Sequence, residues 1–115
     1  MEIIDLHGQK EFSSSHHIHK TLTTTANSEI SVVGWEPGQK SPIHCHPQAD
    51  EIYHVLEGEG LFNDGNRELT LKPGDTVLFP AGEVHTVVAL TRMVLYRVQS
   101  GPDRSAKALD AWPSK

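Results

Sequence analysis

The sequence has a single cysteine, Cys45, in 115 residues. This excludes an internal disulfide and a cysteine-rich zinc module. No apolar run approaches the roughly 18 residues that span a bilayer, and the first residues lack the basic flank of a signal peptide. Lysine and arginine form no cluster, and the net charge is −5 at pH 7, which argues against nucleic acid as a partner. The sequence therefore predicts a cytoplasmic protein that binds neither membranes nor nucleic acid.

Convincing amphipathic helices are also missing. Short runs rich in β-branched and aromatic residues alternate instead with Gly, Pro and Asn turns, a pattern typical of all-β sandwiches and barrels. The strand-like runs cover residues 30–35, 51–56, 60–62, 67–71, 76–79, 85–90 and 93–98. We therefore expect one all-β domain over residues 30–100, an N-terminal segment over 1–29 and a C-terminal tail over 101–115. Within that tail, residues 106–110 are expected to form one helical turn or to fray.

Histidine is abundant, with eight residues in this short chain. His44 and His46 are two apart, so on a strand both imidazoles would point to the same face while Cys45 points away. Glu51 opens the next strand-like run and supplies a carboxylate, and His85 opens a later one. Three imidazoles and one carboxylate suit a divalent transition metal: Fe, Mn, Zn, Ni, Co or Cu. Such a centre carries one net positive charge, which favours an anionic ligand.

Two spaced motifs contain these residues. The first has the form G-x5-H-x-H-x4-E-x6-G and runs from Gly38 to Gly58; the second has the form G-x5-P-x-G-x2-H and runs from Gly74 to His85. Both resemble the motifs of the cupins, which are small antiparallel β-barrels of jelly-roll type. The second family motif often ends in an Asn four residues after its histidine, and this chain has Ala89 at that position. The resemblance covers residues 38–89, nearly half of the chain.

The resemblance implies a single-domain cupin barrel with one metal ion on its inner wall. The ligands carried over from the family are His44, His46, Glu51 and His85. Some cupin-like isomerases use a histidine as a base without metal, so a metal-free barrel is the alternative. Small cupins commonly dimerise through N-terminal strands, which makes the threonine-rich segment 21–25 a candidate dimerising strand and a homodimer the expected state.

Tyr53 lies two residues beyond Glu51 and therefore shares its face of the strand. It is a candidate general acid or hydrogen-bond donor to the metal site, with a core tyrosine as the alternative. Glu51 is a candidate proton acceptor as well as a ligand. His54 has the opposite parity and is expected at the surface or in sheet packing. Cys45 is expected to be a buried structural thiol rather than a nucleophile.

The sequence leaves two interpretations open for two further groups of residues. Arg92 and Arg97 flank the last strand, and one of them would hold a substrate carboxylate if it pointed inward; solvent exposure is the alternative for both. His16, His17 and His19 are expected in a flexible polar entry segment, with a lid or a weak second metal site as the alternative.

The function predicted from these features is that of a metal-dependent enzyme acting on a small organic acid, enol or phenol. A divalent ion with open positions supports dioxygenase (oxidoreductase), decarboxylase, isomerase or lyase chemistry, and the sequence does not select among them. The alternative is a non-catalytic cupin that binds or senses a small molecule. Either way, the predicted partner is a small-molecule ligand.

Overall fold

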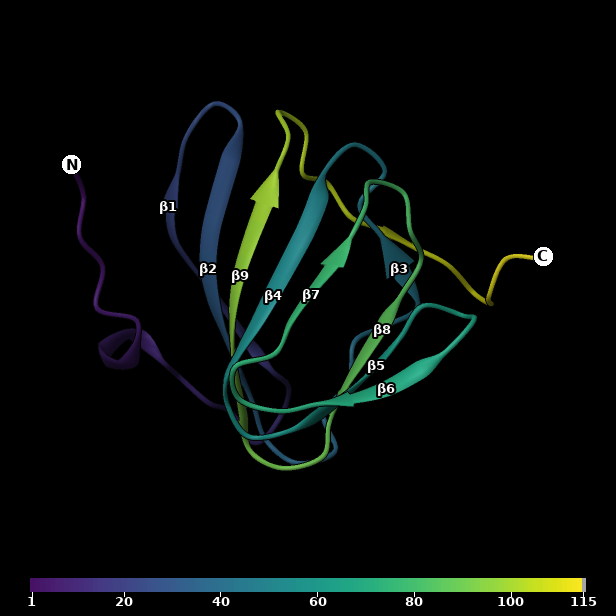
Figure 1. Cartoon of the computed structure of the whole chain (residues 1–115), viewed down its shortest axis with the longest axis horizontal. Coiled ribbons are helices and arrows are strands. Elements are labelled where there is room, and N and C mark those ends of the chain that lie inside the picture. Colours follow the sequence, from purple (N-terminus) through teal and green to yellow (C-terminus); the bar gives the residue numbers. More distant parts are fainter. Residues whose placement is uncertain (115) are drawn as a thin grey trace.

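The computed structural model describes residues 1–114, and they fold into two facing antiparallel sheets (Figure 1). The first sheet has the order β1-β2-β9-β4-β7, and the second has the order β6-β5-β8. The short pair β10-β3 lies next to the second sheet through an isolated bridge between His44 and His85, and Lys40, ahead of β3, forms a second bridge with Val88. The elements are η1 (His7–Gln9), β1 (Ile18–Thr24), β2 (Ser28–Trp35), β3 (His44–Cys45), β4 (Asp50–Glu57), β5 (Gly60–Asn63), β6 (Glu68–Leu71), β7 (Thr76–Phe79), β8 (Thr86–Ala89), β9 (Met93–Ser100) and β10 (Lys107–Ala108).

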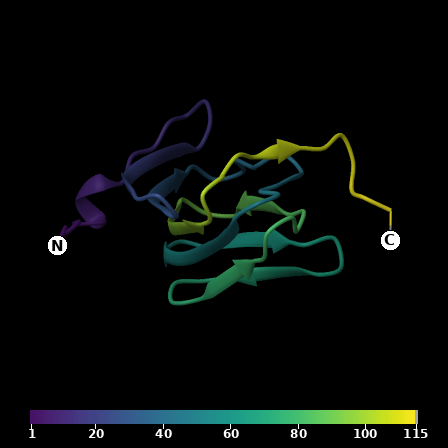
Figure 2. The ribbon, with the colours of Figure 1, turned by 90° about the horizontal axis from the view of Figure 1, so that it is seen from above.

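The jelly-roll barrel predicted from the sequence is confirmed, and the seven strand-like runs correspond to β2 and to β4 through β9. The segment predicted as a helical turn or a frayed end is different. Lys107 and Ala108 form strand β10, which pairs with β3, and the amide of Leu109 donates to the carbonyl of Ile43 at 2.9 Å. Two residues are too few to show an alternating pattern, so pairing with β3 rather than local propensity decides this segment. Figure 2 shows the first residues of the chain and the segment after β10 on opposite sides of the molecule.

Strand β1 lies at one edge of the five-stranded sheet and pairs with β2. Residues before it run across the outer face of this pair, where the backbone of Glu11 and the ring of Phe12 contact Gly34. The threonine-rich segment thus lies mostly within an edge strand. The division of the chain at residues 29/30 and 100/101 stays a prediction.

Cross-strand register arranges the interior side chains of the large sheet in rows. Successive side chains alternate between the two faces of a strand, and the residues of the apolar core identify the inner face. The row at one end contains Glu29, Gln99, Glu51 and Phe79; the next contains Ser31, Arg97, Tyr53 and Val77; the next contains Val33, Leu95 and Val55. The interior is therefore polar at one end and apolar at the other.

The structure explains why one motif position, Gly58, requires glycine. It has a φ of +75°, and a Cβ at this position would collide with the carbonyl of Arg92 and the Cα of Met93 at 2.8 Å. Both the positive φ and the close backbone approach exclude other residues. Gly38 also has a positive φ, of +84°, but nothing lies within 4 Å of its Cβ position, so only the backbone conformation favours glycine there.

Candidate metal centre

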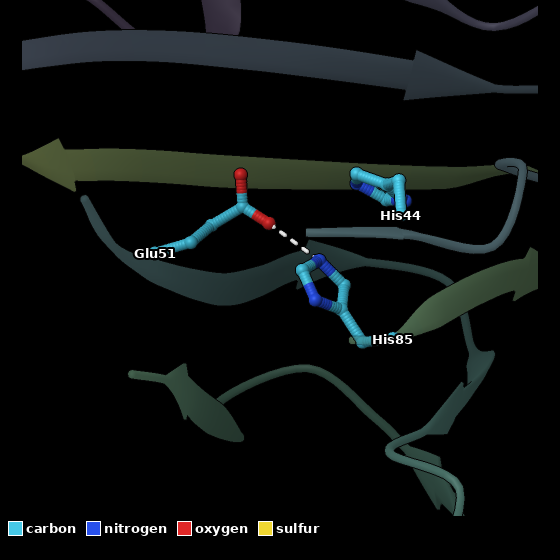
Figure 3. A group of neighbouring side chains, drawn as sticks. All are labelled: His44, Glu51 and His85. Carbon is cyan, nitrogen blue, oxygen red and sulfur yellow. Dashed lines mark hydrogen bonds and ion pairs between the residues drawn. The ribbon is translucent and has the colours of Figure 1, made fainter. Parts of the chain in front are cut away.

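The two sequence motifs meet in space at a pair of histidines. His44 begins β3 and His85 directly precedes β8, and their backbones exchange two hydrogen bonds of 3.2 and 2.9 Å. The amide of Gly82 also donates to the carbonyl of His46 at 2.9 Å. These backbone bonds, between residues 41 and 36 positions apart in the chain, explain how the two motifs place their imidazoles together. Glu51 approaches from β4 in the opposite sheet, so the three side chains point toward one another between the sheets (Figure 3).

His44, Glu51 and His85 form a group that could hold a metal ion. One ligand atom from each lies within 4.8 Å of the others, and all three residues are at least nine-tenths buried. The ring of Phe79 stacks on His85 with the centroids 3.9 Å apart and 6° between the planes. This contact fixes the imidazole in one orientation, as a metal ligand requires.

Hydrogen bonds at Nδ1 leave Nε2 available for a cation. Nδ1 of His44 lies 2.8 Å from the carbonyl of Pro42, and Nδ1 of His85 lies 2.9 Å from the carbonyl of Glu83. A carbonyl only accepts, so each Nδ1 carries the proton and Nε2 of the neutral ring presents a lone pair. Nε2 of His85 lies 2.8 Å from Oε1 of Glu51. A proton or a metal ion must lie between these two acceptors, so the donor set fits a divalent transition metal.

The fourth predicted ligand, His46, lies beside the other oxygen of Glu51. Its Nε2 is 3.0 Å from Oε2, and its Nδ1 is 3.1 Å from the carbonyl of Arg104. The amide of Gln99 lies between them and donates to Oε2 of Glu51 at 2.9 Å while contacting the imidazole of His46 at 3.1 Å. His46 therefore contacts the carboxylate of Glu51 but is not part of the His44–Glu51–His85 group. Its role as a metal ligand stays a prediction.

The electrostatics of the cluster favour an ionised carboxylate. Burial alone would raise the pKa of Glu51, but hydrogen bonds with His46 and His85 and the nearby guanidinium of Arg97 lower it far below its usual range. The same contacts with Glu51 raise the pKa of His46 against the effect of burial. Burial lowers the pKa of His44 and keeps its imidazole neutral. An ionised carboxylate and a neutral imidazole are the forms in which these groups bind metals. A carboxylate with so low a pKa is a weak base, which supports Glu51 as a ligand more than as a proton acceptor.

Arg97 is the inward-pointing arginine, and its position was left open by the sequence. Its Nη2 lies 2.9 Å from Oε2 of Glu29 and donates to Oε1 of Gln99 at 3.1 Å, and its Nη1 is 3.4 Å from Oε2 of Glu51. Arg92 instead lies at the surface, where it pairs with Glu36 at 2.6 Å. Sequence reasoning missed Gln99 and Glu29. Apolar residues occupy both faces of β9, so no pattern in the sequence marked Gln99 as inward-pointing.

Tyr53 lies on the ligand face, one row inside Glu51. It belongs to the apolar core, and its hydroxyl faces Arg97 and Glu51. Burial and the charge of Glu51 raise the pKa of Tyr53 well above its usual range. The phenol therefore keeps its proton at neutral pH and can donate a hydrogen bond, while the raised pKa makes it a weak acid. His54, on the outer face, bonds to the hydroxyl of Thr76 at 2.7 Å, and Cys45 is a buried free thiol, as predicted for both.

The N-terminal histidines are more ordered than the sequence suggested. The ring of His17 stacks on Trp35 with the centroids 4.1 Å apart, and Nε2 of His19 lies 3.6 Å from the carboxylate of Glu29. Burial is the largest influence on both imidazoles and lowers the pKa of each. The predicted flexible entry segment is thus wrong for these two residues, because the pairing of β1 with β2 brings them over the barrel interior.

Comparison with known proteins identifies the family of this barrel. Residues 31–98 match the Cupin domain family, which is more than half of the chain, and the chain therefore belongs to the cupins. An uncharacterized conserved protein with a double-stranded beta-helix domain from Klebsiella pneumoniae has the same fold, with a TM-score of 0.86 and 22% identity over 96% of this chain and 99% of that one.

Two curated relatives carry more specific names. The oxalate-binding protein of Thermotoga maritima is 29% identical over 80 residues, which make up 70% of this chain and 66% of the relative. Germin-like protein subfamily 2 member 2 of Arabidopsis thaliana is 36% identical over 66 residues, or 53% of this chain and 30% of the relative. The chain thus matches just under two thirds of the first relative's length and less than a third of the second's.

Across residues 1–114, no helix has the length and apolar character needed to cross a membrane.

Proposed function

We propose that this cupin is a metal-dependent enzyme that acts on a small organic acid, enol or phenol. The observation that carries the proposal is the buried His44–Glu51–His85 group, in which a ligand atom of each imidazole and an ionised carboxylate lie within 4.8 Å of one another. The proposed ligands are these three residues and His46. A divalent ion held there would polarise an oxygen substituent of the substrate, lower the pKa of bound water or, as iron, activate O₂.

The chain's own residues provide the rest of the proposed site. Gln99 holds Oε2 of Glu51 in place, and Arg97 adds a positive charge beside it. Phe79 covers one face of His85 and excludes water from that side. Tyr53 supplies a protonated hydroxyl one row away, which makes it the proposed hydrogen-bond donor or general acid.

Non-catalytic binding is the second candidate, and one finding favours it: the Thermotoga maritima relative is named as an oxalate-binding protein. Binding and catalysis require the same metal site and differ in whether a bond of the ligand changes.

A turnover assay with a binding measurement distinguishes these two functions. Protein loaded with Fe²⁺ or Mn²⁺ would be mixed with small acids, enols and phenols. Oxygen consumption and NMR of the products would then report turnover. For an enzyme, products accumulate, and Tyr53→Phe lowers kcat by about 10²-fold or more, the usual loss for a general acid, with metal content unchanged. Saturable binding heat with no product after hours would overturn the enzyme and support the binding protein.

A homodimer is also proposed, supported by two surfaces. Strand β1 is an edge of its sheet, and an apolar row crosses the outer face of the same sheet through Ile30, Val98, Ile52 and the exposed Leu78. Light scattering should give twice the 12.7 kDa of one chain. The Leu78→Glu variant should shift toward the monomer if the outer face is the interface. A monomeric parent protein would contradict the proposal.

A further inference from the structure

The segment after β9 lies on the barrel surface and touches it at a few points. Residues 101–112, here called the strap, run from the end of β9 past β3 to the turn between β5 and β6 (Figure 1). The half-buried residues of the strap are Gly101, Arg104, Leu109 and Trp112, and its other residues are exposed. The strap is therefore held by separate anchors rather than by a continuous buried face.

The last two anchors are a backbone bond and an aromatic contact. The amide of Leu109 donates to the carbonyl of Ile43 at 2.9 Å, next to the pairing of β10 with β3. The indole of Trp112 covers Gly65, where a Cβ would lie 3.1 Å from the ring. A cavity of about 230 Å³ borders the same indole. A segment with so few buried contacts separates from the rest of a protein at a small free-energy cost.

The anchor at Arg104 reaches the metal cluster. The carbonyl of Arg104 lies 3.1 Å from Nδ1 of His46. Because a carbonyl only accepts, this contact fixes the proton on Nδ1. It leaves Nε2, which lies 3.0 Å from Oε2 of Glu51, as the nitrogen available inside the barrel. Carbonyl partners of this kind set the tautomer and the ring orientation of metal-bound histidines.

His46 differs in this respect from the other two histidines of the cluster. The Nδ1 atoms of His44 and His85 contact the carbonyls of Pro42 and Glu83, each two residues away in the chain. The carbonyl that orients His46 is 58 residues away and belongs to the strap. Release of the strap would therefore remove the orienting contact of one proposed ligand and leave those of the other two in place.

The carbonyl of Arg104 is itself held in place by a turn. The guanidinium of Arg104 donates to the carbonyl of Gly101 at 2.8 Å, and the amide of Gly101 donates to the carbonyl of Asn27 at 2.7 Å. The carboxylate of Asp103 accepts from the amide and the hydroxyl of Ser105 at 3.0 and 2.7 Å. These bonds fix the backbone on both sides of Arg104, so the docked strap presents its carbonyl in one direction.

We propose that the strap positions His46 for metal binding, so that strap docking and metal binding favour each other. This inference rests on the proposed metal-dependent function and on His46 as the fourth ligand. Linkage requires the two effects to be equal: the factor by which the docked strap tightens the metal is the factor by which the metal stabilises the docked strap. The occupancy of a buried site is thereby coupled to the exposure of a surface segment.

Limited digestion of the unaltered chain with trypsin tests the coupling first. Lys107 lies in β10 and pairs with Cys45, so cleavage after Lys107 follows the population of the undocked strap. Saturating Zn²⁺ should slow this cleavage, measured by mass spectrometry, by about 10-fold, a typical effect of the partner of a metal-bound histidine. The His85→Ala variant, which is expected to lose the metal, should show no such protection, and this excludes inhibition of trypsin by Zn²⁺.

The reciprocal effect is measured with a variant that loosens the strap. Leu109→Pro/Trp112→Ala removes the amide donor to Ile43 and the indole on Gly65. Its affinity for Zn²⁺, measured by competition with a chelator, should fall by about 10-fold, and cleavage after Lys107 should become faster. The matched control Leu109→Ala/Trp112→Phe keeps the amide and an aromatic ring, and it should bind Zn²⁺ like the parent protein.

Equal cleavage rates of the parent protein with and without bound Zn²⁺ would overturn the proposed role of the strap. A variant with rapid cleavage after Lys107 and the Zn²⁺ affinity of the parent would overturn it as well. The digestion of the unaltered chain decides the question even if the proline variant misfolds. Parent protein that binds no Zn²⁺ would contradict the metal function and the strap together, whereas Zn²⁺ binding without protection would contradict the strap alone.

Discussion

The His85→Ala variant is expected to lose stoichiometric metal, falling from about one equivalent per chain to less than a tenth. His85 contributes the Nε2 atom that faces Oε1 of Glu51 at 2.8 Å, and it is fixed from two sides by Phe79 and the carbonyl of Glu83. Alanine removes one metal ligand, and no neighbouring imidazole is positioned to replace it. Mass spectrometry of untagged protein, purified without a nickel column, measures this directly.

His54→Ala is the matched control for this loss. His54 lies on the outer face of β4 and contacts Thr76 rather than the cluster, so its removal should leave the metal content unchanged. His46→Ala should lose metal as His85→Ala does if His46 is the fourth ligand. Full metal occupancy in both His46→Ala and His85→Ala would contradict the ligand assignment.

The Arg97→Met variant is expected to lower the free energy of unfolding of the metal-free protein by about 3 kcal/mol or more. Removing one partner of a buried ion pair leaves an uncompensated charge, which typically costs about 3–5 kcal/mol. Here Glu29 would lose its contact at 2.9 Å and Glu51 would lose its only arginine neighbour among the described residues. Urea unfolding followed by tryptophan fluorescence measures the change.

Two further variants identify the cause of that loss. Arg92→Met removes a surface pair with Glu36, in which the arginine side chain is 62% exposed, so it should cost about 1 kcal/mol or less. The double variant Glu29→Gln/Arg97→Met removes one of the two carboxylates that lose Arg97 and should be more stable than Arg97→Met alone. If Arg97→Met were no less stable than Arg92→Met, the interior ion pairs would not have the role assigned to them.

The fold and the three histidines around Glu51 could be predicted from the sequence because the patterns that indicate them lie within short segments of the chain. Spacing by two residues puts His44 and His46 on one side of the chain, and the turn glycines and prolines separate short strands. The backbone exchange between His44 and His85 then follows from the family's arrangement. The strand β10 could not be predicted in the same way, because a two-residue strand depends on its partner.

The interior network depends on register, which the sequence does not contain. Ser31, Tyr53 and Arg97 are far apart in the chain. They become neighbours because the registers of the β2–β9 and β4–β9 ladders place Arg97 opposite both Ser31 and Tyr53. A shift of one residue in either ladder would turn Arg97 to solvent, which is why both directions were open for it. The same pairing places His17 and His19 over the interior, where composition alone suggested a flexible segment.

The most direct test of the metal centre is an anomalous difference map from crystals of metal-bearing protein, collected at the absorption edge of the metal that the protein contains. We expect one strong peak between Nε2 of His44, Nε2 of His85 and the carboxylate of Glu51, within about 2.0–2.2 Å of its ligand atoms, and close enough to His46 to include it. A peak only at His16, His17 and His19, or no peak inside the barrel, would contradict the central claim and return the buried histidines to acid–base or structural roles.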